Sequence, residues 1–394
     1  MSPQNLTILG ATGSIGVNTL RVVADHPDQY RVFALTAQCS DAPLLQQCRE
    51  FAPRYAVMTD EAAAARLREG ITAAGLATQV LVGAEALAEV ASAPEVDCVM
   101  AAIVGGAGLL PSLAAAKAGK KVLLANKESL VMAGDLFMRT ARDNGALVMP
   151  IDSEHNAIFQ CLPINERARF EQRPNSGFIK VILTASGGPF RNRAHTELEN
   201  ITPDEACAHP NWVMGRKISV DSATLVNKGL ELIEACHLFE VPPSKVEVLV
   251  HPQSIVHSMV CYADGSTLAQ MGNPDMRTPI AYGMAWPHRM NAGVTPLDLT
   301  KCSNLEFYHP DLQRFPGLVL GREAAETGGA APLIYNAANE IAVAAFLAGR
   351  IGFLRIPAII ARVLDQASFP VPRSLDDVLH YDGEARALAA RCLP

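Results

Sequence analysis

Short runs of consecutive hydrophobic residues alternate with helical patterns along the first 150 residues of the chain. These runs cover Leu6–Leu9, Arg31–Ala37, Tyr55–Met58, Gln79–Val82, Asp97–Val104, Val122–Ala125 and Ala146–Pro150. Strands that are hydrophobic at successive positions are buried on both faces, as in a parallel sheet covered by helices. We therefore predict an α/β fold that begins with a doubly wound parallel sheet.

The pattern changes after residue 151. Strands are predicted at Phe178–Thr184, Lys245–Val250, Val256–Tyr262 and Thr267–Met271, with helices near 154–162 and 223–239. Residues 287–311 are rich in Pro, Gly, Asn and Asp and lack periodicity, whereas the chain from 312 onward is helical and alanine-rich. We expect a sheet domain at 1–151, an α+β domain at 152–286, a linker at 287–311 and a C-terminal helical bundle at 312–394.

Composition and charge exclude several classes of protein. The 394 residues include 33 basic and 40 acidic side chains, which argues against nucleic-acid binding. The longest apolar stretch, from Cys98 to Leu110, is too short to span a membrane. Nine scattered cysteines without a C-x-x-C pair, and a strand that begins at Leu6, favour reduced thiols in a cytoplasmic protein without a targeting peptide.

A glycine-rich segment follows the first predicted strand. Gly10, Gly13 and Gly16 lie at a strand-to-helix junction, where helix N–H groups and the helix dipole bind pyrophosphate. In this position the segment predicts a Rossmann-like dinucleotide site rather than a simple tight turn. The next strand ends in Gln38-Cys39-Ser40 without an adjoining acidic residue, which weakly favours NADP over NAD.

Two carboxylates follow the last strand of the predicted parallel sheet. Asp152 and Glu154 are two residues apart, so in extended backbone both would point the same way and suit Mg²⁺ or Mn²⁺. Alternatively, Asp152 or Ser153 caps the following helix, with Glu154 in its first turn.

A third carboxylate lies in a later helical segment. Asn227 and Glu231 are four apart and share one helix face, with Lys228 adjacent. Together with Ser222 they could form an anion and metal site. A solvent-exposed helix face with a Lys–Glu pair is the alternative.

Two glycine-containing segments are candidates for substrate contacts. Ser186 begins the sequence Ser-Gly-Gly-Pro-Phe after a strand, a pattern that could surround a phosphate or form a plain turn. The segment from His209 to Gly215 contains Trp212 and Met214 and predicts either a water-excluding lid or ordinary packing. His251 and His257 are interpreted as structural histidines.

Long motifs in this chain resemble those of the 1-deoxy-D-xylulose 5-phosphate reductoisomerase family. They are GATGSIG, ANKES, DSEHNAIFQ, SGGPF, HPNWVMGRKISVDSAT, NKGLE, HPQSIVHS and PDMRTPI, in the family's order. The resemblance covers nearly the whole chain. It implies a homodimer that uses NADPH and one Mn²⁺ or Mg²⁺ ion per subunit. The implied reaction converts 1-deoxy-D-xylulose 5-phosphate to 2-C-methyl-D-erythritol 4-phosphate for isoprenoid biosynthesis.

The resemblance also implies a role for each matching residue. The implied metal ligands are Asp152, Glu154 and Glu231. The implied substrate contacts are Lys127, Ser153, Glu154, Ser186, His209, Trp212, Met214, Ser222, Asn227, Lys228 and Glu231, of which Glu154, Glu231, Lys127 and His209 are the expected catalytic residues. The implied cofactor contacts are Thr12, Gly13, Ser14, Ile15, Ser40, Asn126, Glu128 and Gly215.

One departure from the family bears on the cofactor. The family usually has Gly-Lys-Asn where this chain has Gln38-Cys39-Ser40, so the basic residue of that loop is missing. Two other hypotheses remain: a semialdehyde-type dehydrogenase, which would need an activated cysteine such as Cys161 or Cys207, and a non-enzymatic dinucleotide sensor.

Overall fold

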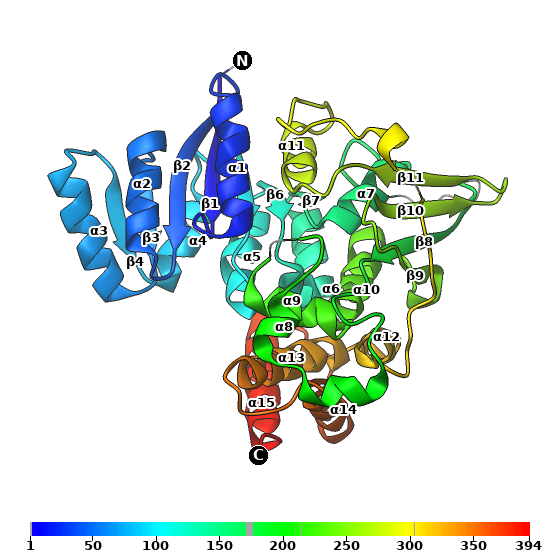
Figure 1. The fold of residues 1–394 in the computed structure, drawn as a ribbon. Helices are drawn as coiled ribbons and strands as arrows, with labels where there is room; N and C mark the ends of the chain where they lie inside the picture. Colours follow the sequence, from blue (N-terminus) through cyan, green and yellow to red (C-terminus); the bar gives the residue numbers. More distant parts are fainter. Residues whose placement is uncertain (1, 171–175, 213, 303) are drawn as a thin grey trace.

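The chain folds into two sheets and a helical C-terminal region (Figure 1). The fold is that of a computed structural model, which describes residues 2–170, 176–212, 214–302 and 304–394. The N-terminus and the C-terminus lie at opposite ends of the molecule. No helix in these ranges is both long and apolar enough to cross a membrane.

The first sheet is parallel and has seven strands in the order β4-β3-β2-β1-β5-β6-β7. Its strands are β1 Gln4–Leu9, β2 Tyr30–Ala37, β3 Tyr55–Met58, β4 Gln79–Val82, β5 Cys98–Ala101, β6 Lys121–Leu124 and β7 Leu147–Pro150. The connecting helices are α1 Ser14–Asp25, α2 Asp41–Phe51, α3 Glu61–Ala73, α4 Ala84–Ser92, α5 Leu109–Lys117 and α6 Lys127–Asp143. Consecutive residues from Leu6 to Leu9 are fully buried, so both faces of the sheet are covered, as the hydrophobic runs predict.

The second sheet has four strands in the order β11-β10-β8-β9. Its strands are β8 Phe178–Ala185, β9 Val246–Val250, β10 Val256–Tyr262 and β11 Thr267–Met271, and only the β8–β9 pair is parallel. The helices of this part are α7 Ser153–Cys161, α8 Pro203–Cys207, α9 Arg216–Ala223, α10 Val226–Phe239 and α11 Arg277–Ala285. Helix α7 packs on β10 and β11, and α10 packs on α6. These contacts place the second sheet beside the end of β7.

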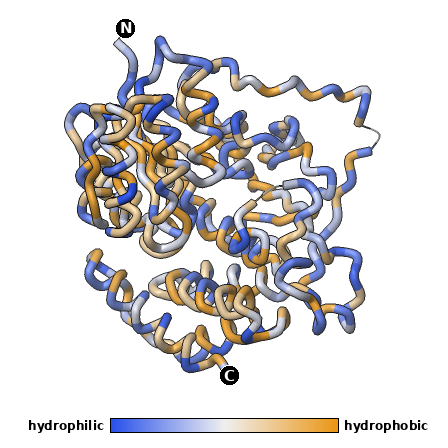
Figure 2. Tube along the Cα trace, turned by 60° about the vertical axis from the view of Figure 1, so that its left-hand side comes forward, coloured by the Kyte–Doolittle hydropathy of each residue, from blue (hydrophilic) through white to orange (hydrophobic). Residues whose placement is uncertain are grey.

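Four helices make up the C-terminal region: α12 Gly317–Thr327, α13 Ala331–Leu347, α14 Arg355–Gln366 and α15 Leu375–Arg391. Figure 2 shows that these helices mix hydrophobic and hydrophilic positions along their length. Their hydrophobic side chains pack on one another, and α12 and α13 also contact α10 and α6. The helical character predicted for this part of the chain is therefore confirmed.

Three local details differ from the predicted elements. Strand β5 ends at Ala101 rather than Val104, because its neighbours β1 and β6 end at Leu9 and Leu124 and offer no further partners. The helix expected near 223–239 begins only at Val226, after Leu225 adopts a left-handed φ of 58°, and the separate helix α9 precedes it. The segment expected as a linker contains a short 3₁₀ turn at Leu299–Lys301 and pairs with β9 through Tyr308.

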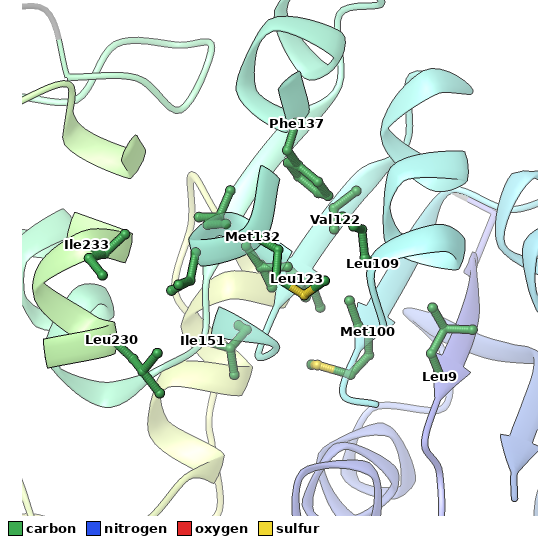
Figure 3. Packing of buried hydrophobic residues seen from close by; sticks show 14 of the residues in the cluster. Leu9, Met100, Leu109, Val122, Leu123, Met132, Phe137, Ile151, Leu230 and Ile233 are labelled. Atoms are coloured by element: carbon green, nitrogen blue, oxygen red, sulfur yellow. The ribbon is translucent and has the colours of Figure 1, made fainter. Parts of the chain in front are cut away.

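Buried hydrophobic residues of both sheets and the C-terminal helices belong to one continuous core. Figure 3 shows Met100, Val122 and Leu123 of the first sheet continuing past Ile151 to Leu230 and Ile233 of α10. Ile151 is completely buried at this junction. The end of β7 and the start of α10 are thus held at fixed positions by packing, and both deliver polar residues to the site described next.

Candidate functional site

A cavity of about 450 Å³ lies between the C-terminal edge of the first sheet, the second sheet and helices α9 and α10. Polar and charged residues from more than six separate segments line it. Gly13, Ser14 and Ile15 line one part, and the carboxylates of Asp152, Glu154 and Glu231 line another. A single cavity therefore joins the glycine-rich loop to the acidic residues.

The glycine-rich loop requires glycine at two of its three positions. Gly10 has a φ of 81°, and a Cβ there would lie 2.7 Å from the carbonyl oxygen of Ala102. A Cβ on Gly16 would lie 2.4 Å from the carbonyl oxygen of Gly10. Helix α1 then begins at Ser14 without a side-chain cap, so its first N–H groups face the cavity without a partner inside the helix.

The three carboxylates come together as the family resemblance implies, although Glu231 is far from the others along the chain. One oxygen each of Asp152, Glu154 and Glu231 lie within 4.8 Å of one another. The ammonium of Lys127, at the start of α6, lies 2.5 Å from Asp152 Oδ2 and 2.9 Å from Glu231 Oε1. Lys127, which follows β6, thus joins Asp152, which follows β7, to Glu231 of α10.

A second lysine completes the charged cluster. Lys228 Nζ lies 2.8 Å from Glu154 Oε1, forms an ion pair with Glu231 and donates to the carbonyl oxygen of Thr184 at 2.6 Å. Asn227 accepts a hydrogen bond from Lys127 at 2.9 Å and donates one to Glu231. Lys228 is 3% and Glu231 is 1% exposed, so the alternative of a solvent-exposed helix face is wrong.

The helix-capping alternative for Asp152 also fails. Asp152 stands at the N-cap position of α7, but its side chain makes no capping hydrogen bond there. Its carboxylate instead contacts Lys127. Ser153 donates its hydroxyl hydrogen bond to Glu154 Oε2 at 2.6 Å rather than capping the helix. The backbone at 152–154 therefore directs both acids toward the cavity.

The acids of this cluster differ in pKa because their neighbours differ. Burial and the nearby Glu231 carboxylate together raise the pKa of Glu154 to about 7. Burial also disfavours the charged form of Asp152, yet Lys127 and His155 hold the pKa of that carboxyl well below its usual value. Three carboxylates against two ammonium groups leave an excess negative charge, which is why one acid holds its proton near neutral pH.

Behind the cluster, His155 and Glu234 form a fully buried pair. His155 Nε2 donates to the carbonyl oxygen of Glu231 at 2.8 Å, and its Nδ1 lies 3.3 Å from Glu234 Oε2. Burial raises the pKa of Glu234 and lowers that of His155, which favours the neutral form of each group. Together with Asp152 they form a second group of close potential ligand atoms, and the hydrogen bond from His155 holds the backbone of Glu231 in place.

The loop after β8 forms a polar corner of the cavity. Ser186 Oγ lies 2.8 Å from His209 Nε2 and accepts from the N–H of Gly188 at 3.2 Å. His209 Nδ1 accepts from the N–H groups of Asn211 and Trp212, so its proton resides on Nε2 and is donated to Ser186. Burial lowers the pKa of His209 to about 4. The hydroxyl hydrogen of Ser186 therefore remains available to a ligand.

The loop between α8 and α9 covers this corner. Asn211 Nδ2 donates to the carbonyl oxygen of Pro252 at 2.6 Å, and the rings of Trp212 and His257 lie 6.3 Å apart. Trp212 and Met214 both line the cavity, while Val213 lies outside the described residues. The segment is thus a loop over the cavity, and its opening and closing stay a prediction.

Two charged residues that the sequence did not single out also line the cavity. Lys217 Nζ lies 2.8 Å from both Glu128 Oε1 and Asp221 Oδ2, and Asp221 accepts from Asn339 of α13 at 2.8 Å. Their four-residue spacing was visible in the sequence, but it equally describes a surface pair. Only the packing of α9 against α10 and α13 buries Asp221 and leaves Lys217 half-buried.

Most of the residues to which the family resemblance gives a role line this cavity, and three do not. The residues that line it are Gly13, Ser14, Ile15, Lys127, Glu128, Asp152, Ser153, Glu154, Ser186, His209, Trp212, Met214, Gly215, Ser222, Asn227, Lys228 and Glu231. Thr12 and Ser40 lie outside its lining, as does Asn126. The amide of Asn126 caps α6 through the N–H of Ser129 and donates to the carbonyl oxygens of Ile103 and Gly105.

Family models match almost the whole chain. A model described as 1-deoxy-D-xylulose 5-phosphate reductoisomerase matches residues 6–134, and models of C-terminal domains of the same enzyme match 148–239 and 271–388. Curated relatives with that description are 59% identical over 393 residues in Cellvibrio japonicus and 59% identical over 390 residues in Dechloromonas aromatica. They cover 99% of this chain and 98% and 97% of their own lengths, respectively.

Solved structures agree with this match. A DOX-P reductoisomerase in complex with NADPH, fosmidomycin and magnesium has a TM-score of 0.93 and is 48% identical, covering 99% of this chain and 98% of its own. The reductoisomerase of Zymomonas mobilis in complex with NADPH has a TM-score of 0.90 at 48% identity, with the same coverage. The chain belongs to the 1-deoxy-D-xylulose 5-phosphate reductoisomerase family.

Proposed function

We propose that this protein uses NADPH and a divalent cation to isomerise and reduce 1-deoxy-D-xylulose 5-phosphate to 2-C-methyl-D-erythritol 4-phosphate. The observation that carries the proposal is the single cavity that connects a dinucleotide-type glycine loop to three convergent carboxylates. Relatives with this activity in their description are 58–59% identical over nearly the whole chain. The reaction requires a hydride donor and a polarised sugar in the same enclosed space.

The acidic cluster fits a divalent ion of the Mg²⁺ or Mn²⁺ type. Its donor set consists of carboxylate oxygens from Asp152, Glu154 and Glu231, which suits a hard cation. The protonation of Glu154 near pH 7 is the expected response of three carboxylates that lack sufficient positive charge. When bound there, the cation would act as a Lewis acid on the oxygens of the sugar and acidify its hydroxyl.

The glycine loop fits the pyrophosphate of NADPH. The uncapped N–H groups at the start of α1 suit an anion, and any side chain at Gly16 would fill the space occupied by the loop backbone. We propose that Thr12, Gly13, Ser14 and Ile15 hold the cofactor, with Gly215 and Glu128 on the other side of the cavity. NADPH supplies the hydride for the reduction step.

The chain's own groups would hold the substrate at both ends. Ser186 can donate its hydroxyl hydrogen to the phosphate because His209 and Gly188 already donate to its oxygen. We propose that Ser222, Asn227 and Lys228 complete this phosphate grip, and that Trp212 and Met214 exclude water above it. Binding energy from the phosphate then orients the carbon skeleton against the acidic cluster.

Proton transfer at the acidic cluster would involve Glu154 and the neighbouring ammonium groups. Glu154 accepts hydrogen bonds from Ser153 and Lys228, so its carboxyl is oriented before substrate arrives. Lys127 links Asp152 to Glu231 and lies where it can donate to a developing oxyanion. We propose that Glu231, or the ionised form of Glu154, accepts the proton that the sugar hydroxyl loses.

The test is NADPH oxidation, followed at 340 nm, with 1-deoxy-D-xylulose 5-phosphate as substrate. Activity should disappear with EDTA and return with Mg²⁺ or Mn²⁺. A protein that binds NADPH but never oxidises it with this sugar phosphate would refute the proposal.

Retained activity after thiol alkylation would exclude the alternative of a semialdehyde-type dehydrogenase. Burial raises the pKa of Cys161 to about 11, which disfavours a thiolate nucleophile.

We also propose that the protein is a homodimer and that it is cytoplasmic. Its domains would divide near residues 151, 286 and 311. The edge strand β11 and its sheet expose Leu268 and Ile179, and the adjoining segment exposes Phe307 and Tyr308, so a second copy has apolar surface to cover. All nine cysteines are free thiols, which suits a reducing compartment. Sedimentation of the purified protein at the mass of a monomer would contradict the dimer.

A further inference from the structure

An ion pair at the end of β2 lies outside the cavity described above. Arg66 Nη2, on α3, lies 2.7 Å from Asp41 Oδ1, at the first residue of α2. The Arg66 side chain is 54% exposed and that of Asp41 is 23% exposed. The hydrogen bond from Arg66 lowers the pKa of Asp41, so both groups are charged at neutral pH. Helices α2 and α3 pack side by side, which keeps the pair together (Figure 1).

Hydrogen bonds tie the glycine loop to this end of β2. The N–H of Gly10 donates to Thr36 Oγ1 at 2.9 Å, and the N–H of Ala11 donates to the Thr36 carbonyl oxygen at 2.8 Å. Gln47 of α2 donates to the carbonyl oxygen of Ala11 at 2.9 Å. In a doubly wound sheet the pyrophosphate binds after the first strand and the adenosine ribose lies at the end of the second. The ribose of a bound dinucleotide therefore falls beside Cys39, Ser40 and Asp41.

The segment around the end of β2 contains no basic side chain that could bind a phosphate on that ribose. Residues 32–48 contain neither Lys nor Arg. The basic side chain that lies there is Arg66, which is 25 positions from Asp41 in the sequence. It reaches Asp41 because α3 packs against α2. A guanidinium has five N–H donors, so an arginine that bonds one carboxylate can also bind a phosphate.

We propose that Arg66 recognises the 2′-phosphate of NADPH and that Asp41 orients its guanidinium and competes with the phosphate for it. This inference rests on the proposed function, since it concerns the cofactor of that reaction. Ser40, adjacent to Asp41, adds a hydroxyl to the same position. Without a 2′-phosphate the cofactor gains nothing from Arg66, and Asp41 is free to accept hydrogen bonds from the ribose hydroxyls.

The proposal predicts opposite effects for the two halves of the ion pair. Arg66→Met should weaken NADPH binding by about tenfold, because a charge-assisted hydrogen bond at an exposed position is lost, and leave NADH binding within about twofold. Asp41→Asn should tighten NADPH binding severalfold, since the guanidinium no longer has a competing carboxylate. Arg68→Met, on the same helix two positions away and exposed, is the matched control and should change neither affinity.

The measurement is calorimetric titration of the substrate-free protein with NADPH and with NADH, without turnover. If the ion pair only stabilises the fold, both variants break the same contact and weaken both cofactors alike, which would overturn the proposal. Unchanged NADPH affinity in Arg66→Met would also overturn it. A wild-type protein that binds neither cofactor would instead refute the proposed function, so the two failures are distinguishable.

Discussion

Glu231→Gln tests the acidic cluster most directly, because it removes one charge and changes little in shape. Glu231 is 1% exposed and interacts with Lys127, Lys228 and Asn227. With all three carboxylates ionised, the cluster of three carboxylates and two ammonium groups has a net charge of −1, and the variant has two of each. Loss of one cation ligand and of its charge should lower kcat/KM by at least about a hundredfold and raise the cation concentration needed for activity.

The same charge count predicts that the variant stays folded. Breaking a buried ion pair usually costs about 3–5 kcal/mol, because one charge is left without a partner. Here Lys127 keeps Asp152 at 2.5 Å and Lys228 keeps Glu154 at 2.8 Å. We therefore expect the free energy of unfolding of the variant to be lower than that of the wild type by less than about 2 kcal/mol. The pKa of Glu154 should fall, since the Glu231 carboxylate is one of the causes that raise it.

Three measurements separate these effects. Steady-state kinetics against Mg²⁺ or Mn²⁺ gives kcat/KM and the cation dependence, urea unfolding gives stability, and NADPH titration should give a Kd close to that of the wild type. Glu240→Gln, at the exposed end of the same helix, is the control and should match the wild type in all three. Turnover within about tenfold of the wild type, with an unchanged cation dependence, would refute the metal assignment.

Three further variants test the loop, the pH response and the phosphate grip. Gly16→Ala should destabilise the protein by roughly 1–3 kcal/mol in urea and weaken NADPH binding, because its Cβ would lie 2.4 Å from the Gly10 carbonyl oxygen; normal NADPH affinity would contradict the role of the loop. Burial lowers the pKa of His257 to about 4, so the folded state binds fewer protons than the unfolded state between pH 6.5 and 4, and stability falls as the pH falls through this range. The stability difference between pH 7 and pH 4.5 should shrink by about 2 kcal/mol in His257→Gln, and an unchanged difference would show that this residue is not responsible. Ser186→Ala should raise the KM for the sugar phosphate by about tenfold while the Kd for NADPH stays constant; an unchanged KM would exclude Ser186 from the phosphate grip.

Local patterns were sufficient for much of the fold. Consecutive buried residues such as Leu6 to Leu9 mark a strand covered on both faces, because side chains alternate between the two faces of a sheet. The glycine loop after β1 was readable because its backbone must approach Ala102 and the start of α1. Where neighbouring strands decided the outcome, as at the end of β5, the hydrophobic run extended beyond the strand.

Within the site, the sequence determined which chemical groups are present and which of them are neighbours along one helix or strand end. Asp152 and Glu154 share a strand end, and Lys228 and Glu231 share a helix, because backbone geometry sets those directions. Only the tertiary structure decided that these segments meet, that Lys127 joins them, and that Lys217 pairs with the buried Asp221 in the same cavity. It also brought Arg66 to Asp41. Such contacts arise from packing between elements distant in sequence, and no local periodicity records which elements will pack together.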